Sequence, residues 1–225
     1  MITAIILAAL TGLMLEPLSG SLAGLLLKKR GRQLARSRRE RLLSGGVLTL
    51  LGVGIGWLYE PLFEGLYLFL LLLVCAVAAI TDIHHRIIPN ETVLAIPALT
   101  LLFGIPGLCG AAGFPRFRPG QALLGLAVCM VIFFLPALFG RSVGAGDVKL
   151  AGAMGFCLGL GFSLGAVVLM GALVLAFGFL QNRLPALQFV KTRIPLGPFL
   201  GLSLCLVLLL SRLPGLAGVF GLLAF

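Results

Sequence analysis

The chain has 225 residues, of which 60% are apolar and 11% charged, and its mean hydropathy is +1.17. This composition excludes an ordinary soluble globular domain and predicts a protein that crosses a lipid bilayer several times. The net charge of +10 suggests acidic partners, but eight of the 17 basic residues lie between Lys28 and Arg41, without aromatic residues among them. Membrane topology and attraction to anionic lipid explain such a cluster, so we expect membrane lipids and no nucleic acid as partners.

Apolar stretches long enough to cross the hydrocarbon core as helices recur along the chain, and none has the two-residue period of a membrane barrel. We predict an all-α fold, a polytopic membrane helix bundle with seven or eight transmembrane helices. The predicted spans are 2–27 (bent near Pro17), 42–59, 62–81, 92–108, 121–139, 148–180 and 198–210. The stretch 148–180 is ambiguous because its 33 residues are long for one span and short for two, with a possible break at 159–161.

The basic cluster between Lys28 and Arg41 is predicted to be cytoplasmic by the positive-inside rule. Two predicted spans separate Asp82 from Asp147, so both lie at one face whatever the orientation, and the charge bias makes that face cytoplasmic. The basic loop 183–193 is cytoplasmic only if 148–180 crosses twice, which favours eight helices. We divide the chain into an N-terminal anchor span with its basic cytoplasmic loop, 1–44, and a membrane-embedded domain, 45–225.

Asp82 ends an apolar run and Asp147 begins one, so each is predicted at a helix end where the hydrocarbon stops. Pro89 limits any helix that continues beyond Asp82. Gly144 and Gly146 precede Asp147, and glycines there permit unusual backbone conformations and close approach by another chain, such as an extended peptide substrate.

These are the only two aspartates in the chain, and a carboxylate at membrane depth is energetically expensive. Singly, Asp82 could face lipid headgroups and Asp147 could be an ordinary helix N-cap. Together at one face they favour a functional pair. Two carboxylates around one water cannot both ionise cheaply, so the ionised one can activate water while the protonated one polarises a scissile carbonyl, as in aspartic proteases.

The other chemically active side chains favour simpler interpretations. His84 and His85 point about 100° apart if helical, so we expect polar residues of a cytoplasmic loop, with no metal and no cofactor. Lys149 lies on nearly the opposite helix face from Asp147 and is expected to meet phosphate headgroups.

Cysteines and glycines are expected to serve packing. The five cysteines are spread singly through apolar spans, which predicts small hydrophobic residues between helices; they are Cys75, Cys109, Cys129, Cys157 and Cys205. Glycines four residues apart let helix backbones approach closely in lipid; the pairs are Gly155/Gly159, Gly161/Gly165 and Gly197/Gly201.

Three segments together resemble the type IV prepilin peptidases, which share a GxGD signature with the archaeal preflagellin peptidases. They are Asp82 with Ile88-Pro89-Asn90, Gly144-Ala145-Gly146-Asp147-Val148-Lys149-Leu150, and Ile194-Pro195-Leu196-Gly197-Pro198-Phe199-Leu200. The resemblance covers about residues 45 to 212. It implies a bacterial inner-membrane aspartyl endopeptidase that cuts the leader of prepilin or pseudopilin substrates at the cytoplasmic face, after a glycine and before the hydrophobic stem, which is the apolar segment of the substrate.

The resemblance also implies roles for individual residues. Asp82 and Asp147 match the catalytic pair of the family. The remaining motif residues would bind substrate or support the motifs; they are Pro89, Asn90, Gly144, Gly146, Lys149, Pro195, Gly197 and Pro198.

The first 45 residues depart from the family pattern. Full-length members begin with a span and a GSFLNV-like stretch, followed by a cytoplasmic domain with two CxxC pairs that is associated with zinc and with N-methylation. Here 19–24 is at most a remnant of that stretch, the basic loop stands in place of the domain, and no CxxC occurs. We therefore expect a short form that cleaves its substrate and lacks N-methyltransferase activity with S-adenosylmethionine.

Two other functions stay open. A small proton-coupled transporter or channel could use the aspartate pair, but it would place carboxylates near the bilayer midplane and more polar residues along the spans. An inactive assembly factor of a secretion system could keep the fold, although it would not need intact motifs.

Overall fold

The structure is a computed structural model that describes residues 2–59, 62–138, 144–183 and 195–213. These residues form seven helices and no strand: α1 (Ile2–Lys28), α2 (Arg38–Leu58), α3 (Leu62–His85), α4 (Asn90–Leu108), α5 (Pro119–Leu138), α6 (Ala145–Arg183) and α7 (Gly197–Leu210). Five of them, α2 to α6, are long and apolar enough to cross a membrane, and α7 is a shorter apolar helix. The prediction of an all-α, multi-pass membrane protein is confirmed.

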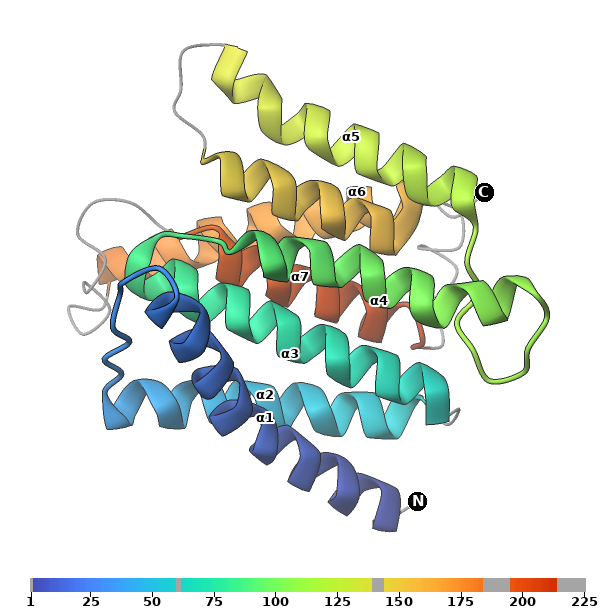
Figure 1. Cartoon of the computed structure of the whole chain (residues 1–225), viewed down its shortest axis with the longest axis horizontal. Coiled ribbons are helices and arrows are strands. Elements are labelled where there is room, and N and C mark those ends of the chain that lie inside the picture. Colours follow the sequence, from blue (N-terminus) through green and yellow to red (C-terminus); the bar gives the residue numbers. More distant parts are fainter. Residues whose placement is uncertain (1, 60–61, 139–143, 184–194, 214–225) are drawn as a thin grey trace.

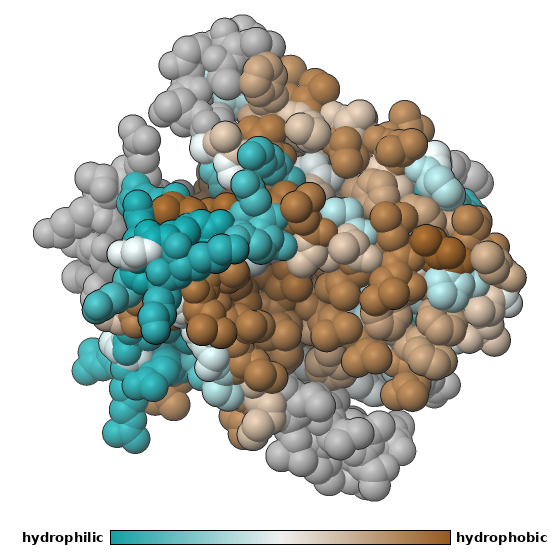
Figure 2. Space-filling model, in the orientation of Figure 1, coloured by the Kyte–Doolittle hydropathy of each residue, from teal (hydrophilic) through white to brown (hydrophobic). Residues whose placement is uncertain are grey.

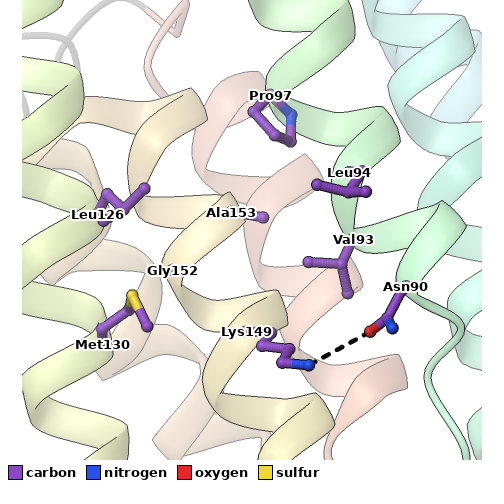
Figure 3. A pocket seen from close by; sticks show the side chains of 9 residues that line it. All are labelled: Asn90, Val93, Leu94, Pro97, Leu126, Met130, Lys149, Gly152 and Ala153. Carbon is purple, nitrogen blue, oxygen red and sulfur yellow. Dashed lines mark hydrogen bonds between the residues drawn. The ribbon is translucent and has the colours of Figure 1, made fainter.

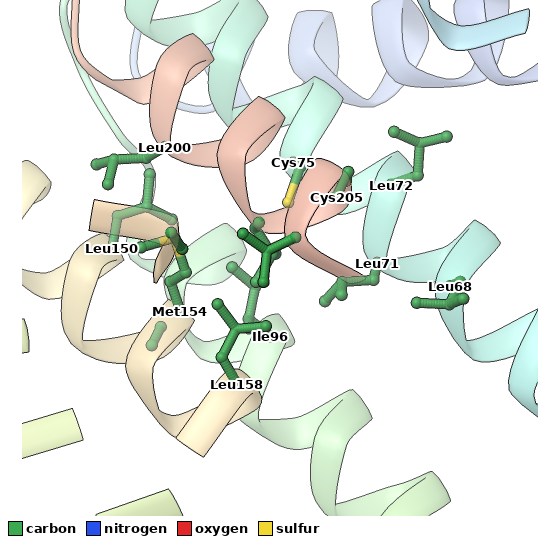
Figure 4. Packing of buried hydrophobic residues seen from close by; sticks show 14 of the residues in the cluster. Leu68, Leu71, Leu72, Cys75, Ile96, Leu150, Met154, Leu158, Leu200 and Cys205 are labelled. Atoms are coloured by element: carbon green, nitrogen blue, oxygen red, sulfur yellow. The ribbon is translucent and has the colours of Figure 1, made fainter. Parts of the chain in front are cut away.

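Helix α3 lies inside the bundle, where it packs against α1, α2, α4 and α7 (Figure 1). Helix α6 packs against α4, α5 and α7. The apolar core forms where α3, α4, α6 and α7 meet, with Leu71, Ile96, Met154 and Leu200 almost completely buried (Figure 4). This packing fixes the positions of the ends of α3, α6 and α7, which carry the candidate functional residues.

The long helix α6 turns back on itself at Gly159. Gly159 has φ 71° and ψ 176°, which is not helical. Asp147 and Phe177 would lie about 45 Å apart on a straight helix. However, the rings of Phe177 and Phe199 are 5.4 Å apart, close to Gly197, whose N–H donates to Asp82.

The start of α6 lies near the same place, because Gly146 packs against Ile88, six residues after Asp82. Both ends of α6 therefore lie at one end of the bundle, and Figure 1 shows the later part of α6 (orange) returning behind the earlier part (gold). The possible break predicted at 159–161 is found at Gly159, between segments 145–158 and 160–183. The double crossing favoured by the charge pattern agrees with this course, although 184–193 of the last basic loop lie outside the described residues.

Substitution of Gly159 by alanine is expected to lower the free energy of unfolding by about 1–3 kcal/mol, because only glycine adopts this backbone conformation easily. The new Cβ would also lie 3.3 Å from Cβ of Gln121 on α5. Thermal unfolding in detergent micelles measures the loss. The matched control is Gly171→Ala, since no atom lies within 4 Å of the new methyl there, and alanine is the better helix former. Equal stability of the two variants would contradict the conclusion that the turn in α6 requires glycine at position 159.

Glycines permit the close helix contacts that sequence analysis predicted. The backbones of Gly155 on α6 and Gly125 on α5 meet so closely that neither position has room for a side chain. Gly201 on α7 faces Cys75 on α3, where an added Cβ would lie 3.0 Å from the Cys75 Cβ. The role of the pair Gly161/Gly165 stays a prediction.

The cysteines follow the predicted pattern with one exception. Cys75, Cys129 and Cys205 are buried and Cys157 is partly buried, as expected for small apolar residues between helices. Cys109 is exposed, so the prediction is wrong there. It lies directly after the last residue of α4, beyond the apolar run that packs in the bundle.

The segment between α1 and α2 is held by contacts within the protein, in addition to any contact with lipid. Ser37 and Glu40 form a capping box: the N–H of Ser37 donates to the Glu40 carboxylate at 3.0 Å, and the N–H of Glu40 donates to the Ser37 hydroxyl at 3.2 Å. Helix α2 therefore begins at Arg38, before the predicted start at residue 42. The guanidinium of Arg36 lies 2.8 Å from the carboxylate of Glu16 on α1, and both side chains are largely buried.

Candidate active site

Hydrophilic side chains gather at one end of the molecule, where the α1–α2 segment lies (Figure 2). Asp82 lies near this end, in the last turn of α3, and is only 6% exposed. Its Oδ2 accepts a hydrogen bond of 2.8 Å from the backbone N–H of Gly197, the first residue of α7. A Cβ at position 197 would lie 2.9 Å from this Oδ2 and 3.0 Å from the Asp82 Cβ, so glycine is required for the contact.

Asp147 lies in the first turn of α6 and is partly buried. Its backbone N–H donates to the carbonyl of Gly144 at 3.0 Å. A Cβ at position 144 would lie 2.8 Å from the Oδ2 of Asp147, whereas a Cβ at position 146 would lie 3.2 Å from the Ile88 Cβ. Gly144 and Gly146 therefore leave room for the carboxylate itself and for the segment that follows Asp82.

In this structure Gly144 and Gly146 provide space for neighbouring side chains rather than a left-handed backbone conformation. The side chains that approach these glycines are those of Asp147 and Ile88, and the approach of a substrate chain stays a prediction. Contact between Gly146 and Ile88 joins the two aspartate segments. The two aspartates therefore come from helix ends that pack against each other.

The turn after Asp82 carries backbone strain. Arg86 donates its N–H to the Asp82 carbonyl at 2.8 Å and has φ 52°, a left-handed conformation that ends α3. For a residue other than glycine this conformation costs about 1–3 kcal/mol and is often found at functional sites. Pro89 then precedes the first residue of α4, and its fixed φ of −61° suits that place.

Asn90 and Lys149 connect the same two segments. Nζ of Lys149 donates to Oδ1 of Asn90 at 3.4 Å, beside a groove between α4, α5 and α6 (Figure 3). Sequence analysis expected a lipid headgroup as the partner of Lys149, whereas the structure places its ammonium group against Asn90. This contact joins α6 to α4 and includes neither Asp82 nor Asp147.

The segment around Gly197 begins α7 directly over Asp82. Pro195 is partly buried before the helix, and Pro198 occupies the first turn, where proline is well tolerated because the first N–H groups have no helical partner. Within this motif, Gly197 forms a hydrogen bond with the Asp82 carboxylate. Sequence analysis selected Gly197 but did not predict its contact.

His84 and His85 lie in the last turn of α3, so the prediction of a loop is wrong. The two rings face different partners: Nε2 of His85 lies 3.0 Å from the Gln33 carbonyl, and Nε2 of His84 lies 3.6 Å from the Glu40 carboxylate. In the described part of the chain, no group of three or more His, Cys, Asp or Glu side chains is arranged to hold a metal ion.

The basic segment after α1 holds both sides of the turn that follows Asp82. Arg32 donates to the His85 carbonyl at 3.3 Å, and Arg30 donates to the Glu91 carboxylate at 2.6 Å. Sequence analysis missed these contacts. The signal that could have indicated them is Glu91 beside Asn90, because its negative charge is opposite to that of the distant basic segment.

The Arg30–Glu91 pair is expected to contribute only about 0.2–1 kcal/mol to folding, because both side chains are partly exposed and water screens the interaction. A double-mutant cycle with Arg30→Ala and Glu91→Ala, followed by thermal unfolding in detergent, measures the coupling energy. The cycle with Lys29, which lies 3.8 Å from Glu91 and is 75% exposed, serves as the control and should give a smaller value. A larger coupling for Lys29 would contradict this geometry.

The profile of the type IV leader peptidase family matches residues 69–180 of this chain. Searches of curated proteins and of solved structures found no match to the chain. The matched range is about half of the chain and contains both aspartates, the turn between α3 and α4, and the glycines before Asp147. The chain belongs to the type IV leader peptidase family and is a multi-pass membrane protein of the protease class.

Proposed function

We propose that the protein is a membrane aspartyl endopeptidase that removes the leader peptide of prepilin or pseudopilin substrates, with Asp82 and Asp147 as its catalytic pair. The observation that carries this proposal is the placement of the two aspartates. Each lies at a helix end at the same end of the bundle, beside a glycine that leaves room for its carboxylate. A transporter would be expected to hold such groups near the bilayer midplane instead.

The proposed mechanism uses only the two carboxylates and one water. The ionised carboxylate accepts a proton from the water, whose oxygen then attacks the scissile carbonyl carbon. The protonated carboxylate donates a hydrogen bond to the carbonyl oxygen and stabilises the charge that develops there. When the tetrahedral intermediate collapses, the C–N bond breaks and the leaving nitrogen takes a proton from the pair. The hydrogen bond from Gly197 holds the carboxylate of Asp82 in place during these steps.

The proposed site faces the cytoplasm. Arg32 and Gln33, from the most basic segment of the chain, contact His85 at the end of α3 that carries Asp82. Because segments rich in Lys and Arg stay on the cytoplasmic side, this end is assigned to that side of a bacterial inner membrane. A substrate would then present its leader in the cytoplasm and its apolar segment within the bilayer.

The proposed activity is limited to peptide-bond cleavage. The family members that also methylate the new N-terminus carry two CxxC pairs, and these 225 residues contain none. The product is therefore expected to leave the enzyme with an unmodified amino group.

Incubation of the purified protein with a tagged prepilin or pseudopilin in proteoliposomes tests the proposal. We expect a shift in substrate size, with cleavage after the last glycine of the leader and no added methyl mass, as determined by mass spectrometry. Uncleaved substrate under conditions that keep the enzyme folded would contradict the proposal. Proton or solute flux that depends on the aspartates would then support the transporter.

A further inference from the structure

A groove of about 490 Å³ runs between α2, α3, α7 and the end of α6. Apolar side chains such as Val47, Leu51, Ala76 and Leu202 form most of its walls, with Phe177 at one side. Its polar residues lie together where α2 begins and α3 ends; they are Arg36, Glu40, Ser44 and His84. The groove is therefore apolar along its length and charged at the end of the bundle that carries the candidate site.

The groove begins directly beside Asp82. Ile83, the next residue of α3, lines it, and so does Pro198, the residue after Gly197. The α3 wall residues nearest to Asp82 are Ala79, Ile80 and Ile83, which lie about 60–160° from it around the helix axis, so the groove opens to the side of Asp82. A chain bound at the Asp82 carboxylate can therefore continue into this groove by passing Ile83 and Pro198.

The length of the groove suits a membrane helix. Helix α2 lines it from Glu40 to Leu51, which corresponds to about 16 Å of helix or three turns. This is about half of the roughly 30 Å of hydrocarbon in a bilayer. Val47 and Ile83 are about half exposed (47% and 52%), so a partner can enter sideways from the lipid.

The groove between α4, α5 and α6 is a less suitable path for the same chain. It is smaller, about 350 Å³, and is lined on α6 by Lys149, Gly152 and Ala153 (Figure 3). These three positions lie about 140–240° around the helix axis from Asp147. Its α6 wall therefore faces away from the Asp147 carboxylate.

We propose that the groove between α2 and α7 binds the first three turns of the apolar substrate segment that follows the scissile bond. This inference rests on the proposed peptidase function and adds a specificity site to it. The walls would accept an apolar helix, and the bond before that helix would lie at Asp82. Substrates would then be selected by the apolar segment as well as by the residues at the cleavage position.

Filling the groove tests its role in binding. Val47→Trp places a large ring in the α2 wall, and Val131→Trp is the matched control on α5, at a position 58% exposed and outside both grooves. We expect Val47→Trp to raise KM for the full-length substrate at least tenfold. The yield of folded protein should equal that of Val131→Trp. Equal KM values for the two variants, with cleavage intact, would overturn the proposal that this groove binds the substrate. The proposed peptidase function would still stand.

Cross-linking tests the groove without any need for cleavage. A photoreactive amino acid is placed at Val47, at Leu94 in the α4–α5 groove or at Val131, in a protein that carries Asp147→Asn. We expect cross-links from position 47 to the first three turns of the apolar substrate segment, and at most background from the other two positions. Cross-links mainly from position 94, or equal labelling from all three as for a groove filled by lipid, would overturn the proposal.

Discussion

Conversion of Asp82 or Asp147 to asparagine is expected to lower the rate of leader cleavage by about 10²–10⁴-fold, because either change removes a group that must exchange a proton. Asparagine has nearly the same shape as aspartate, and its side-chain oxygen can still accept the N–H of Gly197. Neither variant should therefore lose folded protein. Cleavage rates for purified, folded protein in proteoliposomes measure the effect.

The matched control is Glu64→Gln, which makes the same chemical change at the opposite end of the bundle. Glu64 lies in the first turn of α3, about 27 Å of helix away from Asp82, and forms an ion pair with Arg212 at 2.6 Å. This variant should cleave at the rate of the unchanged protein. Because the two aspartates act as a unit, the double variant should be no slower than the slower single one. Normal cleavage by either single aspartate variant would refute the proposed mechanism.

The sequence predicted the features that depend on neighbouring residues. Runs of apolar residues predicted the helices to within about four residues at their ends, since long apolar stretches must satisfy their backbone groups internally. The break at Gly159 was suggested by the length of the apolar run and by its glycines. The placement of Asp82 and Asp147 at one end of the bundle followed from the number of spans between them.

Features that depend on pairing between distant segments could not be predicted. Arg30 and Glu91 are 61 residues apart in the chain, and their opposite charges alone do not identify which basic residue pairs with Glu91. The same holds for Arg36, which is buried against Glu16 rather than exposed to lipid. For this reason the basic segment was interpreted as a lipid anchor, whereas the structure places part of it against the end of α3.

The glycines near the aspartates show the same limit in another form. Gly144 and Gly146 were selected as motif residues, but glycine in a sequence does not reveal whether backbone freedom or lack of a side chain is required. The structure resolves this, because neither has a positive φ and an added Cβ at either one meets a specific neighbour. The neighbour of Gly146 is Ile88, 58 residues earlier, so only the folded arrangement reveals the reason.

Gly197→Ala is expected to lower the cleavage rate at least tenfold per folded molecule, because the new methyl group would displace α7 from Asp82. The methyl carbon would lie 2.9 Å from Oδ2 and 3.0 Å from Cβ of Asp82, closer than such atoms normally approach. Relief of this crowding lengthens or breaks the hydrogen bond from the position-197 N–H and shifts the carboxylate. A displacement of about 1 Å in a catalytic group can lower a rate by about 10²-fold.

Gly201→Ala separates this effect from a general loss of helix packing. It lies one turn further along α7, and its new Cβ would lie 3.0 Å from the Cys75 Cβ, so the crowding between α7 and α3 is similar. Both variants should lose about 1–3 kcal/mol of stability from overpacking, measured by thermal unfolding in detergent. Only Gly197→Ala should also lose activity per folded molecule, since only position 197 contacts the carboxylate. If the two variants lost activity equally, Gly197 would act through the packing of α7 and not through its contact with Asp82.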